Sequence, residues 1–176
     1  MTQYLDHLLV ALYKGIGEKE NKQVMKNLPL CLKYLGRYCP PSAYGTLVLQ
    51  AIRNELASFY PHTQQGAVHA FGYLFAGTIE IFPKDESLAT VEKLLDDFIS
   101  AIESHVLDSL DLELADSLTE TLKNMIEMVI YKKKKGLDIS IWHRHNKSVF
   151  YMLLRALGVY NNFKLINKQE PEHYIS

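Results

Sequence analysis

The feature that most constrains the fold of this chain is a hydrophobic residue followed by glycine inside a helix-like apolar pattern. Three copies are extended by a nearby tyrosine, namely Leu35-Gly36-Arg37-Tyr38, Phe71-Gly72-Tyr73-Leu74 and Leu157-Gly158-Val159-Tyr160. The first two sites are 36 residues apart, and a recurrence at about 35–45 residues is typical of stacked helical hairpins. Because each hairpin in such an array contacts mainly its neighbours, the array offers an extended surface for binding partners.

Apolar residues at helical spacing predict seven helices joined by short turns, with no strand-like alternation. The sixth of these helices has its apolar stripe at Leu114, Leu118, Leu122, Met125 and Val129. Consecutive helices with links this short are antiparallel neighbours. We therefore expect an all-α chain with a HEAT/armadillo-like α-solenoid architecture of about three helical hairpins plus one C-terminal helix. The expected repeats cover residues 2–39, 41–82 and 85–135, the last helix covers 140–160, and 161–176 form a flexible tail.

Proline and glycine set the expected helix ends. Pro29 lies inside the helix expected over 18–38 and predicts a kink or a break there. The next helix is expected over 42–59, with Phe59 on its apolar stripe, and Pro61 then takes the first position of the following helix. Gly158 is expected to be the glycine that follows the end of the last helix.

Gly36 and Gly72 fall in the second helix of two expected hairpins. Glycine inside a helix costs about 1 kcal/mol relative to alanine, so another interaction must offset that cost. Without a Cβ atom, the helix can approach a neighbouring backbone closely, and the preceding Leu35 or Phe71 can fill the groove beside it. We expect both glycines to mark close helix–helix contacts.

Composition excludes several classes of protein. The formal net charge is −1 and charged residues make up 22% of the chain, so no global field favours nucleic acid or an anionic membrane. No apolar run is long enough for a membrane span, and the N-terminus lacks the pattern of a signal peptide. Cys31 and Cys39 are too far apart on one helix for a disulfide and are expected to be small buried side chains. These features favour the cytoplasm.

The motifs of residues 4–104 resemble those of the HEAT-repeat dynein axonemal assembly factors. The resemblance is carried by the opening helix from Tyr4 to Lys14, by the stretch from Leu35 to Tyr44, and by Gly66 to Phe71. In the second piece a helix end, a proline pair and an aromatic restart follow in the order found in the family. From Tyr131 onward the sequence shows no such match.

The resemblance implies a non-catalytic scaffold that helps pre-assemble ciliary dynein arms in the cytoplasm. Its partners would be proteins, namely axonemal dynein chains and chaperones, with no nucleic acid, membrane or small-molecule substrate. Another HEAT or TOG-type module, for nuclear transport or tubulin binding, is the alternative. The first expected helix has no polar capping helix before it, which predicts a piece of a longer array.

Residue types that carry chemistry occur without the spacing that chemistry needs. His143 and His145 lie on different faces of a helix, and His62 and His69 lack a third ligand. Asp96-Asp97 is read as part of a solvated helix face, and the run Lys132–Lys135 as a charge cluster at a helix C-terminus. We therefore expect no enzymatic activity and no catalytic, cofactor-binding or metal-binding residue.

Overall fold

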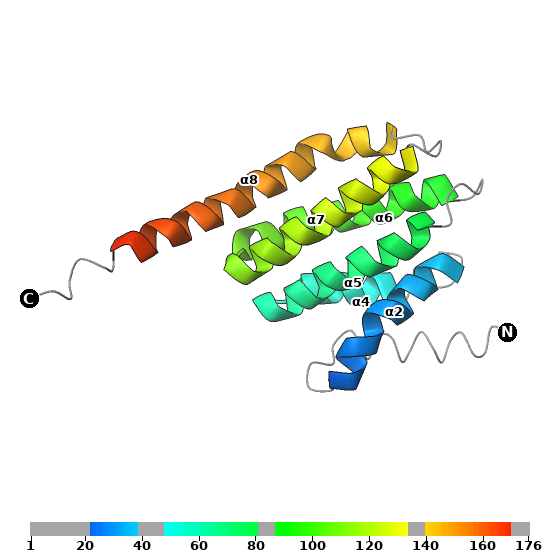
Figure 1. Cartoon of the computed structure of the whole chain (residues 1–176), viewed down its shortest axis with the longest axis horizontal. Helices are drawn as coiled ribbons and strands as arrows, with labels where there is room; N and C mark the ends of the chain where they lie inside the picture. The colour runs from blue at the N-terminus through cyan, green and yellow to red at the C-terminus, as the bar shows by residue number, and fades with distance from the viewer. Residues whose placement is uncertain (1–21, 39–47, 81–86, 134–139, 170–176) are drawn as a thin grey trace, which may run out of the picture.

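The structure is a computed structural model that describes residues 22–38, 48–80, 87–133 and 140–169, and every regular element in these residues is helical (Figure 1). The all-α expectation is confirmed there. The main helices are α2 (Lys22–Tyr38), α4 (Val48–Leu56), α5 (Pro61–Glu80), α6 (Ser87–Ala101), α7 (Leu112–Lys133) and α8 (Ser140–Gln169). Between α6 and α7 lie a π-helical turn, η1 (Ile102–Val106), and a 3₁₀ turn, η2 (Leu107–Ser109).

Helix α7 has the predicted form. Its expected apolar stripe is buried along its whole length, at Leu114, Leu118, Leu122, Met125 and Val129. Asp111 caps its start, because the Asp111 carboxylate accepts a hydrogen bond of 2.8 Å from the Leu114 backbone N–H. Helix α5 begins at Pro61, as predicted.

Two local expectations are wrong, at the ends of α4 and α8. Helix α4 ends at Leu56, so Phe59 lies in the following turn and is 96% exposed. Helix α2 continues across Pro29, so no break occurs there, and its ribbon changes direction part-way along, in keeping with the kink that was the other expectation (Figure 1). Helix α8 runs to Gln169, so 161–169 are helical where a tail was expected, and Gly158 lies inside this helix. The expected helix before α2 lies outside the described residues.

Helix α5 is the centre of the fold and packs against α2, α4, α6 and α7. Helices α2, α5 and α7 contact one another in series, and α4, α6 and α8 do the same. The first series is parallel, because its C-terminal ends meet at Glu80. The Glu80 carboxylate lies 3.6 Å from both Lys33 and Arg37 of α2. The backbone carbonyl of Glu80 accepts a hydrogen bond from the Lys132 side chain of α7.

The contact of α2 with α5 is close enough to require glycine. A Cβ atom on Gly36 would lie 2.3 Å from the Leu74 carbonyl oxygen, and one on Gly77 would lie 1.9 Å from the Lys33 carbonyl oxygen. The close approach predicted at Gly36 is therefore confirmed, and Gly77 completes it from the other helix. Gly72 faces α7, where its Cβ would lie 2.9 Å from the Thr121 methyl group.

A buried glutamine ties the start of α5 to the end of α4 and to the turn before α7. Gln64 is 1% exposed, and its amide nitrogen donates hydrogen bonds to the carbonyls of Leu56 (3.0 Å) and His105 (2.9 Å). Its amide oxygen accepts a bond of 2.8 Å from Ser109. One side chain thereby satisfies carbonyls that the helix ends leave unpaired.

Gly77→Ala and Gly66→Ala, two variants on the same helix α5, test the close contact between α5 and α2. We expect Gly77→Ala to destabilise the protein by about 1–3 kcal/mol, because the new methyl group meets the backbone of α2. Gly66→Ala should be neutral or stabilising by up to about 1 kcal/mol, since nothing lies within 4 Å of its Cβ position. Urea denaturation measures both, and equal effects would contradict the close contact.

Gln64→Leu tests the buried amide. We expect a loss of about 1–3 kcal/mol of unfolding free energy, because two carbonyls and the Ser109 hydroxyl lose their partner away from water. Gln50→Leu is the matched control, because Gln50 is exposed on α4 and its side-chain amide donates a hydrogen bond to Asn54 one turn away. Thermal and urea unfolding of both variants give the comparison, and a Gln64 variant as stable as the control would exclude this role.

Candidate functional site

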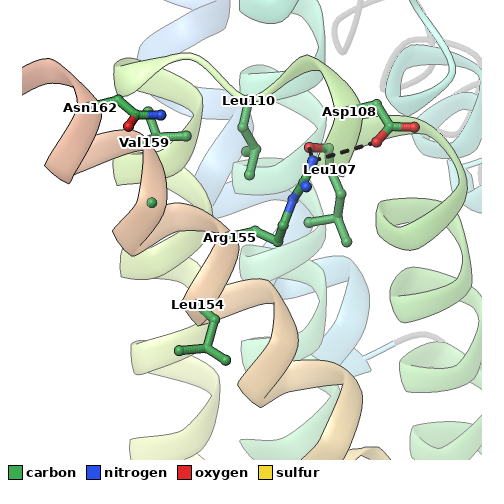
Figure 2. A pocket seen from close by; sticks show the side chains of 8 residues that line it. Leu107, Asp108, Leu110, Leu154, Arg155, Val159 and Asn162 are labelled. Atoms are coloured by element: carbon green, nitrogen blue, oxygen red, sulfur yellow. Dashed lines mark hydrogen bonds and ion pairs between the residues drawn. The ribbon is translucent and has the colours of Figure 1, made fainter.

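A pocket opens where α8 passes the corner between α6 and α7. Its volume is about 290 Å³, and Figure 2 shows the side chains around it. The corner contributes Leu107, Asp108 and Leu110, and α8 contributes Leu154, Arg155, Gly158, Val159 and Asn162. The π-helical turn η1 and the 3₁₀ turn η2 change the direction of the chain before α7 begins, and the residues of this corner form one wall of the pocket.

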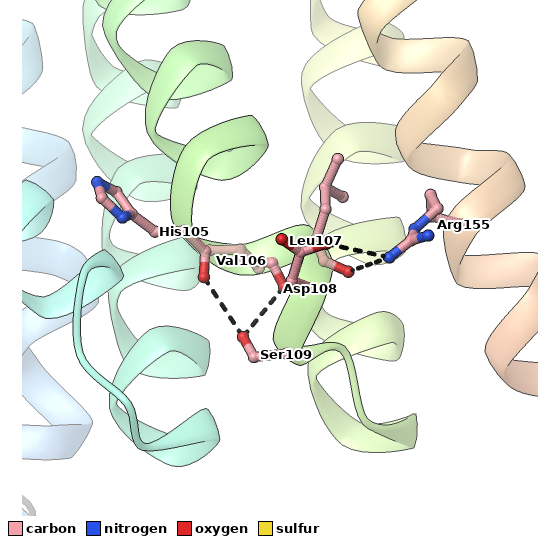
Figure 3. Close-up of polar contacts among 6 residues, drawn as sticks. All are labelled: His105, Val106, Leu107, Asp108, Ser109 and Arg155. Carbon is pink, nitrogen blue, oxygen red and sulfur yellow. Dashed lines mark hydrogen bonds and ion pairs between the residues drawn. The ribbon is translucent and has the colours of Figure 1, made fainter.

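Arg155 fixes α8 to this corner (Figure 3). Its guanidinium donates a hydrogen bond of 2.8 Å to the Leu107 carbonyl oxygen and lies 3.5 Å from the Asp108 carboxylate. On the other side of the turn, the Ser109 hydroxyl lies 3.1 Å from the Val106 carbonyl oxygen and 2.8 Å from Gln64. The corner is thus held from α5 and from α8 at once.

Gly158 keeps the pocket open. It lies inside α8 rather than at its end, and nothing lies within 4 Å of the place where its Cβ would be. Unlike Gly36 and Gly77, it does not serve a close helix contact in the described residues. Any larger side chain at this position would project toward the pocket that Gly158 lines.

The pocket has a mixed lining. Four of its lining residues are Leu or Val, and its lining holds no histidine, cysteine, serine or threonine. Its one carboxylate and one guanidinium, Asp108 and Arg155, already face each other. Polar atoms contribute somewhat more of the pocket surface than apolar atoms do, so the pocket offers both apolar and polar contacts to a bound side chain.

The outer face of α8 adjoins this pocket. Phe150, Leu154 and Leu157 are 63%, 48% and 52% exposed. Their spacing of four and then three residues puts them on one stripe of the helix, away from the buried Val149, Met152 and Ala156. No apolar stripe was predicted for the last helix, although Phe150, Leu154 and Leu157 recur in the sequence at helical spacing.

The charged residues singled out in the sequence join helices. Asp97 pairs with Arg53 of α4. On the other side, Asp96 lies 3.9 Å from Arg144 and 2.8 Å from His145 of α8. The His145 contact has the distance of an ion pair without the alignment of a hydrogen bond. Asp96 is exposed, as expected for a solvated helix face, whereas Asp97 is half-buried; both carboxylates also bridge to neighbouring helices.

Other candidates from the sequence stay apart. His62 of α5 lies 3.7 Å from Glu113, and the structure brings no third metal ligand to it: within the described residues, no group of three or more His, Cys, Asp or Glu side chains could hold a metal ion. Cys31 is exposed, so its expected burial is wrong, and Cys39 lies outside the described residues. Lys132 and Lys133 form the last turn of α7, as expected for that part of the lysine run.

Tyr160 anchors α8 beyond the pocket. Its hydroxyl donates a hydrogen bond to the Asp116 carboxylate of α7. This bond, together with partial burial and the charge of Asp116, raises the pKa of Tyr160 above its ordinary value of 10.0, against a smaller lowering by Thr119. The contact helps explain why α8 continues past the glycine and asparagines at 158, 161 and 162.

The sequence was compared with protein-family models, curated proteins and solved structures, and none matches. Among the described helices, none combines the length and the apolar character needed to cross a membrane.

Tyr160→Phe tests the anchor through its pH dependence. The bond to Asp116 raises the folded pKa of Tyr160, so its stabilisation is complete below pH 10.0 and is lost as pH rises through the folded value. We expect Tyr160→Phe to lower stability by about 0.5 kcal/mol at pH 8, a small value because the contact is open to solvent.

Thermal unfolding between pH 7 and 11 measures this difference, and Asp116→Asn is the matched variant. In Asp116→Asn, the pKa of Tyr160 should move down toward 10.0 in a spectrophotometric titration. If the wild-type protein instead became still more stable relative to Tyr160→Phe above pH 10.0, the assigned bond would be contradicted.

Proposed function

We propose that this protein is a non-catalytic protein-interaction scaffold of the HEAT/armadillo α-solenoid type. The observation that carries the proposal is the serial contact of alternate helices, α2 with α5 and α7, and α4 with α6 and α8. In a solenoid, the equivalent helices of successive hairpins form two such rows, and each hairpin packs on the next. The glycine contact between α2 and α5 supports the same arrangement, because it joins equivalent helices of adjacent hairpins.

We further propose that the scaffold acts in the cytoplasm during the pre-assembly of axonemal dynein arms. The support is the resemblance of residues 4–104 to the HEAT-repeat dynein axonemal assembly factors. The part of that stretch that the structure describes includes α2, α4, α5 and α6. Helices of one row line one face of a solenoid and form its usual binding surface. On α2 and α5 this row exposes Tyr34, Tyr38 and Tyr73, residues well suited to protein interfaces.

Affinity purification from ciliated cells tests this function. We expect the tagged chain to recover axonemal dynein chains together with chaperones. The double variant Tyr34→Ser, Tyr38→Ser should recover at least several-fold less dynein, because loss of interface tyrosines is costly. Phe59→Ser is the matched control, since Phe59 is exposed in the turn after α4 and not on this row.

The alternative functions give a different result in the same experiment. Recovery of tubulin or of nuclear-transport cargo, without dynein chains, would contradict the dynein assignment and favour another HEAT-type module. Equal loss of dynein in the tyrosine and Phe59 variants would contradict the assignment of the surface.

A further inference from the structure

The outer face of α8 is an apolar surface with a net positive border. Phe150, Leu154 and Leu157 form its apolar centre, and the helices that pack on α8, namely α7 and α6, lie on its other side. Figure 1 shows α8 at the edge of the bundle, with its C-terminal part running past the other helices. The described part of the chain leaves this stripe open to solvent.

The charge of α8 has one sign. Its thirty residues include five lysines and arginines and no aspartate or glutamate. Arg144 and Arg155 face acidic residues of the bundle, Glu92 and Asp96 for the first and Asp108 for the second. By contrast, the exposed Lys147 and Lys164 share the helical face of the apolar stripe and border it at both ends.

The pocket beside the stripe is continuous with it. Leu154 belongs to both, because it is 48% exposed on the stripe and also lines the pocket next to Gly158 (Figure 2). A helix lying along the stripe could place one of its apolar side chains in this pocket. Apolar anchors at helical spacing with a pocket for one of them are the features of helix-in-groove recognition.

We propose that the outer face of α8 and the Gly158 pocket together bind an acidic amphipathic helix of a partner protein. This inference deepens the proposed scaffold function and rests on it. The partner helix presents three apolar residues at i, i+4 and i+7 to Phe150, Leu154 and Leu157, and carboxylates to Lys147 and Lys164. The stretch from Lys147 to Lys164 measures about 26 Å along a helix, so a partner helix of about 18 residues covers it.

Charge selects this occupant over two others. A second copy pairing through the same stripe would place the cations of one α8 against those of the other, with no carboxylate on either helix. An anionic membrane would match the charge, but α8 buries its opposite side on α7 and offers lipid only a three-residue stripe. A helix with acidic flanks matches both the charge and the narrow shape.

The probe for this proposal is a synthetic, fluorescein-labelled 18-residue peptide with leucines at i, i+4 and i+7 and flanking glutamates. We expect the full chain to bind it in fluorescence anisotropy and to bind more weakly as salt rises. Two control peptides should bind at least about tenfold more weakly. One has the same composition with its leucines on different faces, and the other has lysine in place of each glutamate.

Three variants locate the site. Leu154→Glu should weaken peptide binding about tenfold or more, whereas Leu30→Glu should leave it unchanged, because Leu30 is similarly exposed (56%) on α2, outside this surface. Gly158→Leu should also weaken binding, since its side chain projects toward the pocket, while its thermal stability is maintained or raised by the loss of a helix glycine. Circular dichroism verifies that each variant is folded.

Several results would overturn the proposal. These are equal binding of the control peptides, equal effects of Leu154→Glu and Leu30→Glu, and no binding of the acidic peptide. Vesicles of phosphatidylserine and phosphatidylcholine test the membrane, and sedimentation velocity tests self-association. Leu154-dependent binding of vesicles alone, or a dimer that Leu154→Glu dissociates, would assign the surface to that occupant instead.

The outcome separates this proposal from the proposed function. If the acidic peptide does not bind while dynein chains are still recovered from ciliated cells, the docking site is wrong and the scaffold function stands. If the peptide binds through Leu154 and no dynein chain is recovered, the docking surface is supported and the role in dynein pre-assembly is contradicted.

Discussion

The close packing of α2 on α5 is the contact on which the rest of the structure depends. It brings the backbones together at Gly36 and Gly77, at a separation that no side chain would permit. Because α5 also packs against α4, α6 and α7, its position fixes both series of helices. Helix α5 contains three glycines, at positions 66, 72 and 77, which together cost about 3 kcal/mol of helix propensity, and the packing of the buried residues of α5 offsets this cost.

The polar contacts at the two ends of α5 have distinct consequences. Gln64 holds the N-terminal end against α4 and against the corner that leads into α7, so this corner is fixed where it meets α8. At the C-terminal end, Glu80 collects cations from α2 and α7, where the carbonyl end of a helix favours positive charge. The pocket beside Arg155 is therefore formed by a corner that is held from two sides, between α6 and α7, and by the edge helix α8.

The apolar patterns of the sequence predicted the fold class and most buried stripes. Every residue of the predicted α7 stripe is buried, because a regular heptad-like pattern leaves only one face for the core. The close contact at Gly36 was also predictable, since glycine inside a helix needs a compensating interaction. Gly77 was missed because it follows the small residue Ala76 and has no tyrosine after it, unlike Gly36 and Gly72.

The sequence was less informative about α8 and the candidate site. Gly158 and the asparagines after it suggested a helix end, but each costs at most about 1 kcal/mol, and the contact of Tyr160 with Asp116 holds the helix together beyond them. The partners of Gln64 and Arg155 include backbone carbonyls more than forty residues away, which no residue pattern encodes. The pairing of Asp96 and Asp97 with opposite neighbours likewise depends on tertiary packing.

Native-state hydrogen exchange of the full chain is the most direct test that α5 is the centre of the helical packing and that α8 is an open edge helix of the described bundle. We expect the slowest amide exchange in α5, slower exchange in α7 than in α8, and the fastest helical exchange over 161–169, where α8 extends past the bundle (Figure 1). Amides of α5 that exchange as fast as those at the end of α8 would contradict it.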